Sequence, residues 1–315
     1  MQILRETCER IEQTVEGTLQ GLERRRMADK HKAKNITVSI LGTLTIVYLV
    51  LIFCKGYNSK ALEGIFALAL FDVLMYFVFK DLFYTIFKKK HIKTYKAQVV
   101  PTLVESVFPG ASYSPKGAIS KRDLKETGLF KFKREHDFES EDTITGRIGK
   151  TDFSFCEIRV SHQEQNGEDS YKTVYDFFGF AFIADFNKHF HGRTLFSSKK
   201  SHLNVGFFSD LQPCVIEDLE FEKRFMTYAT DDQQARYIIT PGLQQRILDL
   251  NDFFDNQELG ISFHDGLMFM IVDSGTNHFE VNYDFDGVKR DLFALSILGD
   301  IVEQMNLNLR IWSKE

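Results

Sequence analysis

Apolar residues form long uninterrupted runs in the first third of the chain and short alternating runs in the rest. No charged residue occurs from Ile36 to Cys54, a length that crosses about 30 Å of hydrocarbon at about 1.5 Å per residue. A second apolar segment runs from Ala61 to Phe79, with an extension through Phe87 left open. Two such neighbours joined by a six-residue polar turn predict a transmembrane hairpin over residues 35–87 rather than two buried core helices.

The segment before the first span, residues 1–34, has apolar positions at spacings of three and four. They are Leu4, Cys8, Ile11, Val15, Thr18/Leu19 and Leu22. This pattern predicts an amphipathic cytoplasmic helix with a coiled-coil-like seam. Thr18 and Gly21 interrupt the seam, so docking on the soluble domain or on a partner is favoured over an autonomous coiled coil. Pairing with a second copy stays open.

Residues 88–315 predict a cytoplasmic domain that alternates strands and helices. The segments 152–160 and 171–186 flank the polar loop 161–170, which indicates an antiparallel hairpin. Its second strand is expected to be central, because both of its faces are apolar. The residues expected to be buried there are Phe178, Phe180, Phe182 and Ile183.

Turn and capping residues place the other elements of this domain. Asp265-Gly266 predicts a two-residue hairpin, and Thr240-Pro241 predicts the start of a helix. Further helices are expected near 99–107, 120–126 and 286–309. An antiparallel sheet with flanking helices is an α+β fold.

Charge adds an orientation to this architecture. Residues 1–96 carry a net charge of +7 and the remainder −12, which matches the total of −5. Basic residues flank the hairpin on both sides, whereas its turn holds only Lys55 and Lys60. The positive-inside rule therefore predicts a multi-pass protein with both termini in the cytoplasm. With no sign of an outer compartment in the sequence, we expect the membrane to be a bacterial inner membrane. The basic stretch 24–34 is expected to contact anionic phospholipid, and the acidic domain argues against nucleic-acid binding.

Known catalytic patterns are missing from the sequence. It has no HExxH, no GxSxG and no CxxC, and its four cysteines suit a reducing compartment. The stretch 146–151 resembles a phosphate loop, but Ile144 stands where that motif needs glycine and a strand pattern follows. We therefore expect no cofactor and no metal, and an enzyme is disfavoured, although one of unrecognised type stays open.

Asp72 lies near the middle of the second apolar segment, where a carboxyl group is costly. The prediction is an interhelical hydrogen bond to Thr43 or Thr45, or a bond to a second copy. A proton or ion pathway is the alternative, but one carboxylate in two spans does not make a pathway.

Polar residues cluster directly after the most apolar strand, and we predict a functional surface there. Its residues are Asp185, Asn187, Lys188, His189 and Arg193. Loops at strand ends often carry function, and an anionic ligand would suit this composition. The alternative is a fold role, in which Asp185 or Asn187 caps a turn and Arg193 pairs with a carboxylate. His189 and His191 give only a weak metal signal.

Several stretches together resemble a known family. They are Gly146–Phe155, Phe178–Lys188, His191–Thr194, Asp218–Phe225 and Tyr228–Pro241. The chain is similar to a bacterial two-span membrane-protein family that is catalogued only as a domain of unknown function, number 3137. The resemblance covers most of residues 90–310 and the preceding hairpin. It implies no assigned activity, but a LemA-type membrane protein as a partner. This sequence departs from the family at Cys156, where serine is usual.

These features favour a non-enzymatic, membrane-anchored scaffold or partner-binding protein. A sensor or carrier for a lipid or small ligand is the alternative, because an aromatic-rich sheet could enclose an apolar molecule. A homo-oligomer is also compatible with the sequence.

Overall fold

The structure is a computed structural model that describes residues 2–55, 59–167, 170–185, 191–199, 210–254 and 257–304. The chain divides into two compact units. The first unit contains residues 1–99 and 280–288, and the second contains residues 100–279 and 289–315. Each unit is described by itself below.

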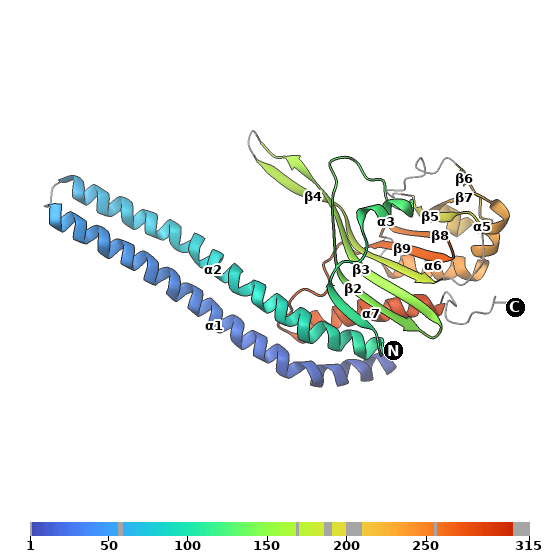
Figure 1. Cartoon of the computed structure of the whole chain (residues 1–315), viewed down its shortest axis with the longest axis horizontal. Helices are drawn as coiled ribbons and strands as arrows, with labels where there is room; N and C mark the ends of the chain where they lie inside the picture. Colours follow the sequence, from blue (N-terminus) through green and yellow to red (C-terminus); the bar gives the residue numbers. More distant parts are fainter. Residues whose placement is uncertain are drawn as a thin grey trace. The chain divides into compact units, whose positions relative to one another are not determined.

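The first unit contains α1 (Gln2–Lys55) and most of α2 (Ser59–Val107), two long helices that run antiparallel (Figure 1). The predicted amphipathic segment and the first apolar segment are one continuous helix. The predicted helix over 99–107 is likewise the end of α2, because Pro101 lies inside that helix and does not begin a new one.

Contacts at several levels hold α1 against α2. Near the middle of the apolar segments, the Thr45 hydroxyl donates to Asp72 Oδ2 at 2.6 Å. Nearer the turn, the Tyr48 hydroxyl approaches Gly64 so closely that a Cβ at Gly64 would clash with it. Small residues allow such close contacts between apolar helices. The amphipathic seam is buried, because Ile11, Val15, Leu19 and Leu22 are each at most 4% exposed. Leu4 and Cys8 of the seam lie outside the side chains described.

A nine-stranded antiparallel sheet forms the second unit, in the order β1-β2-β3-β4-β9-β8-β5-β7-β6. Its strands are β1 (Ser112–Lys116), β2 (Asp137–Ile148), β3 (Thr151–Gln165), β4 (Tyr171–Asp185), β5 (Thr194–Ser198), β6 (Gln212–Pro213), β7 (Phe225–Ala229), β8 (Leu259–His264) and β9 (Leu267–Asp273). The helices are α3 (Lys121–Glu126), α4 (Leu219–Arg224), α5 (Asp232–Ile238), α6 (Pro241–Phe253) and α7 (Phe285–Gln304). The predicted α+β class is confirmed.

Local sequence explains the start or turn of several elements. Ser120 caps α3 and Thr240 caps α6, with Pro241 in its first turn. Asp265 and Gly266 have φ of 53° and 74°, the left-handed pair that a tight hairpin between β8 and β9 requires. These three predictions are confirmed.

The hairpin of β3 and β4 is longer than predicted. The segment 161–165, expected in a loop, pairs with 171–175 and extends the two strands as a ribbon. Its polar residues misled the prediction because most side chains of this ribbon face water, so no apolar alternation marks the strands.

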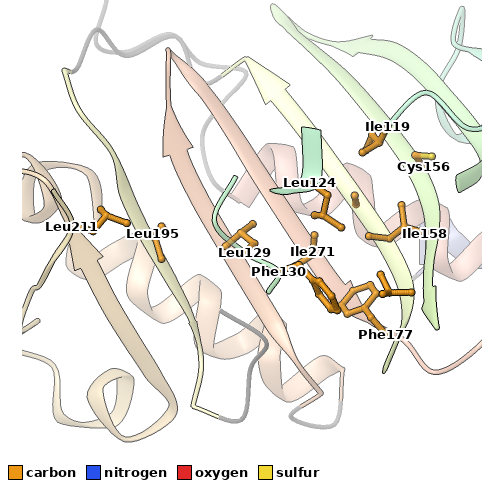
Figure 2. Close-up of a cluster of buried hydrophobic side chains, with 12 residues drawn as sticks. Ile119, Leu124, Leu129, Phe130, Cys156, Ile158, Phe177, Leu195, Leu211 and Ile271 are labelled. Atoms are coloured by element: carbon orange, nitrogen blue, oxygen red, sulfur yellow. The ribbon is translucent and has the colours of Figure 1, made fainter. Parts of the chain in front are cut away.

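The core lies on both faces of the central strand β4. Figure 2 shows one cluster, in which Leu124, Leu129 and Phe130 pack against Ile158 and Phe177. On the opposite face, Phe180 meets the rings of Phe155 and Phe254 at 5.2 and 5.7 Å.

Burial along β4 agrees with the prediction at two of four positions. Phe180 and Phe182 are at most 2% exposed, but Phe178 and Ile183 are only half-buried. Phe178 lies where the ribbon extends beyond the core, and its ring contacts Tyr175 and Arg159.

Candidate functional site

A polar cluster lies at the end of the helical hairpin that is remote from its turn. We call it the hairpin-base cluster, and it consists of Glu23, Arg26, Asp29, His91 and Tyr283. All five residues belong to the first unit. His91 is its centre, on α2, and is 2% exposed.

Both ring nitrogens of His91 have partners. Nε2 lies 2.9 Å from Asp29 Oδ2, and Nδ1 lies 3.2 Å from the Tyr283 hydroxyl. Because a carboxylate only accepts, we assign the ring proton to Nε2, and Nδ1 then accepts from Tyr283. Burial raises the pKa of Tyr283 to about 12, so its hydroxyl keeps its proton at neutral pH. Arg26 lies 4.6 Å from the centre of the Tyr283 ring, a cation–π distance.

A pocket of about 320 Å³ opens beside this cluster, within the size range of small-ligand sites. It is lined by Leu22, Arg25, Asp29, Lys90, His91 and Thr94. Arg25 and Lys90 are exposed at its rim, whereas His91 is buried. Two cations beside a hydroxyl and an imidazole suit a phosphate or carboxylate group. Asp29 opposes an anion, but it is already bonded to His91.

The polar surface predicted after β4 is only partly described. Asn187, Lys188 and His189 lie outside the described residues, and Asp185 is the last residue of β4. Arg193 is described, and its Nη1 donates to the carbonyls of Glu126 and Thr127 at 2.8 and 3.4 Å.

The contacts of Arg193 favour the fold role for this residue. They occupy the guanidinium with carbonyls at the end of α3, where a cation also suits the helix dipole. Burial lowers the pKa of Arg193, but an arginine stays charged at any physiological pH. The functional role of the whole segment stays a prediction.

Asp72 has one of the two partners predicted for it. Thr45 donates to its carboxyl group, whereas the Thr43 hydroxyl donates to the carbonyl of Ser39 in its own helix. The predicted interhelical hydrogen bond is therefore present. Asp72 Oδ1 is buried without a hydrogen-bond partner. A proton or ion role for this residue stays untested.

Two groups of side chains in the second unit have metal-ligand chemistry. The first consists of His136, His162 and Asp176, and the second of Glu141, Asp142 and Glu157. Sequence analysis missed both, because their members are far apart in the chain and only strand register brings them together.

The acidic group is held by its own neighbours. Tyr113 donates to Asp142, Arg159 donates to Glu141, and the backbone N–H of His278 donates to Glu157 Oε1 at 2.7 Å. These donors stabilise the buried carboxylates, so hydrogen bonds within the fold explain the acidic group without a metal ion.

The chain is thus an α+β protein with a long helical hairpin. Within it, residues 175–307 match the family model described as "Protein of unknown function (DUF3137)", which confirms the family resemblance of the sequence. The match begins in β4, so the hairpin and β1–β3 lie outside it, and the wider coverage stays a prediction.

No curated protein matches this chain. A solved structure, titled "crystal structure of the mycobacterial trehalose monomycolate transport factor A, TtfA", is similar at 11% identity. The similarity covers 69% of this chain and 93% of that one, with a TM-score of 0.29. A likeness of this size carries no argument about the present protein.

Proposed function

We propose that this protein is a two-span membrane anchor that presents a partner-binding sheet domain at the cytoplasmic face of the bacterial inner membrane. Large apolar side chains left exposed on both helices of the hairpin carry the proposal. On α1 they are Val38, Ile40, Leu44, Ile46, Val47, Leu49, Val50, Leu51 and Phe53. On α2 they are Phe66, Leu70, Phe71, Val73, Leu74, Phe77, Val78, Leu82 and Ile86.

Exposure of these apolar side chains to water would destabilise the hairpin. Burying one such side chain stabilises a protein by about 1.5–3 kcal/mol, and nine are exposed on each helix among the hairpin side chains that the structure describes. One described helix, between Ile11 and Cys54, has a stretch long and apolar enough to cross a membrane by length and composition. The matching exposed residues on α2 support a second span, which the proposal places at 61–79. Lys80 and Asp81, paired at 3.6 Å, would then stand at its cytoplasmic boundary.

The hairpin-base pocket fits this placement. Asp29 and His91 lie about seven and eleven residues from the proposed ends of the two spans, roughly 10–16 Å along an upright helix. This is beyond the headgroup layer, about 5–7 Å thick on each side, but within reach of long basic side chains. Arg25 and Lys90 at the pocket rim would contact the phosphate of an anionic lipid. The basic stretch 24–34 would then lie beside the lipid headgroups.

The partner-binding role rests on the ribbon of β3 and β4. Tyr171 and Tyr175 are 69% and 57% exposed, and Tyr175 stacks on Phe178 at 5.5 Å. Tyr and Arg dominate the energetically important residues of protein interfaces, and Arg159 lies 5.7 Å from the Phe178 ring. Two partners are candidates: a LemA-type membrane protein, which the family resemblance implies, and a second copy of this chain.

The carrier alternative has little support from the described core. The apolar hollow between α3 and the sheet measures about 10 Å³, room for about one water molecule. It is lined by residues such as Ile119, Phe182 and Phe269. A lipid chain or an apolar metabolite would not fit there.

Cysteine labelling tests the anchor. In a variant without the four native cysteines, Asn58→Cys should react with an impermeant thiol reagent added to intact cells. Ser170→Cys should react only after lysis. Labelling of Ser170→Cys in intact cells, or protection of Asn58→Cys, would contradict the proposed topology.

Co-purification after mild cross-linking in native membranes tests the partner role. The double variant Tyr171→Ala/Tyr175→Ala should lose the partner, and mass spectrometry would distinguish a LemA-type protein from a second copy. Tyr237→Ala, a 49% exposed tyrosine on α5, is the matched control and should keep it. The partner role would be contradicted if native purification recovered only single, uncomplexed chains.

A further inference from the structure

Strand register brings two histidines and an aspartate together where the β3–β4 ribbon leaves the core. Asp137 pairs with Ser161, so His136 precedes β2 beside His162 of β3. On the other side of β3, Val160 pairs with Phe177 and Ser161 with Tyr175. Asp176 is therefore the extra residue of a β-bulge, a feature that redirects a side chain.

The three side chains converge. His162 Nδ1 lies 2.6 Å from Asp176 Oδ2, and His136 Nε2 lies 3.7 Å from the same oxygen. One ligand atom from each residue lies within 4.8 Å of the others. Phe130 and Phe132 pack near the His136 ring, with centroids at 5.9 and 6.3 Å.

His136 has an unused polar atom. Its side chain is 1% exposed, and its Nδ1 accepts the backbone N–H of Lys133 at 3.2 Å. Its Nε2 is buried without a hydrogen-bond partner, since 3.7 Å exceeds hydrogen-bond length. Buried polar atoms almost always have partners, so an unpaired nitrogen directed at a carboxylate and a second imidazole calls for a ligand.

We propose that His136, His162 and Asp176 bind a divalent transition-metal ion of the zinc class. Imidazole and carboxylate ligands bind zinc at about 2.0–2.2 Å, so tetrahedral ligand atoms lie roughly 3.3 Å apart. The observed 2.6 and 3.7 Å bracket this value, and all three ligand atoms lie within 4.8 Å of one another. Shifts on the order of 1 Å would therefore complete the site. Three protein ligands leave a fourth position for water or for a group from a partner.

Binding rearranges protons within the rings. The metal takes Nε2 of His136, so the ring proton moves to Nδ1 and the contact with Lys133 is lost. In the same way, His162 moves its proton from Nδ1 to Nε2, and its side chain is 25% exposed to water. The loss is one long neutral hydrogen bond, whereas metal coordination is strong enough to fold whole domains.

The site would fix the ribbon to the rest of the sheet. It joins the segment before β2, the middle of β3 and the bulge of β4, and Asp176 directly follows the exposed Tyr175 in the chain. The bound ion would therefore order the surface that we propose for a partner. The metal site itself does not depend on that role.

Zinc binding to the purified full chain, carrying a tag without histidine, tests the proposal. Isothermal titration should give one zinc ion per chain, and cobalt should give the visible absorption of a tetrahedral site. His136→Gln, His162→Gln and Asp176→Asn should each weaken zinc binding at least tenfold, because loss of even an outer-shell partner costs 10–100-fold. Glu141→Gln, from the acidic group, is the matched control and should bind zinc like the parent.

His162 is half-buried, and glutamine can still donate a hydrogen bond to Asp176, so this variant keeps the test separate from folding. His162→Gln should melt close to the temperature of the metal-free parent, but zinc should no longer raise that temperature. The proposal is overturned if the parent binds no zinc, if His162→Gln binds it with unchanged affinity, or if only Glu141→Gln loses it. If a zinc-free chain still captures its partner, partner binding does not need the metal, and the zinc titration alone decides the metal site.

Discussion

Phe180 is the position at which the burial of β4 can be tested most directly. Its side chain is 2% exposed and meets the rings of Phe155 and Phe254. Truncating a buried phenylalanine to alanine costs about 3–5 kcal/mol, and two ring pairs of about 0.5–1.5 kcal/mol each favour the upper half. For a domain of about 200 residues, 1 kcal/mol corresponds to about 2–4 °C, so Phe180→Ala should lower the melting temperature by about 6–20 °C.

The assay is thermal unfolding of the detergent-solubilised full chain, with parent and variants heated at one rate. Tyr171→Ala is the matched control, because it removes an aromatic side chain from the same strand at a position that is 69% exposed. Its effect should stay within about 0.5 kcal/mol. If Phe180→Ala melts no lower than Tyr171→Ala, the assignment of β4 to the centre of the core is wrong.

Three further predictions concern polar groups. Arg193→Ala should destabilise the chain by about 1–3 kcal/mol, seen as a lower melting temperature, because two backbone carbonyls at the end of α3 lose their donor. Burial lowers the pKa of His278 to about 4, so the unfolded chain alone takes up a proton as the pH falls below about 6.5. Stability is therefore full above that pH and falls by up to about 3 kcal/mol towards pH 4, and His278→Gln should flatten this dependence in pH-resolved melts. The pair Arg25→Gln/Lys90→Gln should weaken binding of anionic lipid, followed by native mass spectrometry, by about 2 kcal/mol or roughly 30-fold, whereas Lys172→Gln should not.

The elements that the sequence predicted well are those set by local chemistry. Ser120 and Thr240 begin helices because their side chains satisfy backbone N–H groups, and Asp265-Gly266 turns because its backbone adopts positive φ. Such signals lie within a few residues of each other. The segment 161–165 was missed as strand for the opposite reason, since its pairing depends on a partner strand and its polar residues show no buried face.

The candidate sites were harder to predict because they depend on register. His136 and His162 are 26 positions apart, and Asp176 reaches them only through a bulge of one residue. No spacing motif describes that arrangement. The hairpin-base cluster likewise joins Asp29 and His91 to Tyr283, which arrives from the far end of the chain. The sequence predicted a basic stretch beside the first apolar segment, but not the hydrogen bonds of the buried His91.

Hydrogen bonding separates structural from functional roles among the polar residues that drew attention. Arg193 looked functional in the sequence, yet its donors meet carbonyls, so removing it should affect folding first. Asp72 accepts from Thr45 with Oδ2, whereas its Oδ1 is buried without a hydrogen-bond partner, so a proton or ion role for this residue stays a prediction. His136 differs from Arg193, because a rigid strand pair brings its unpaired nitrogen close to two further ligand atoms. Leaving a buried nitrogen unpaired costs free energy, and a bound ion would remove that cost. No sequence motif indicated His136, yet its surroundings give the strongest argument for a bound ligand.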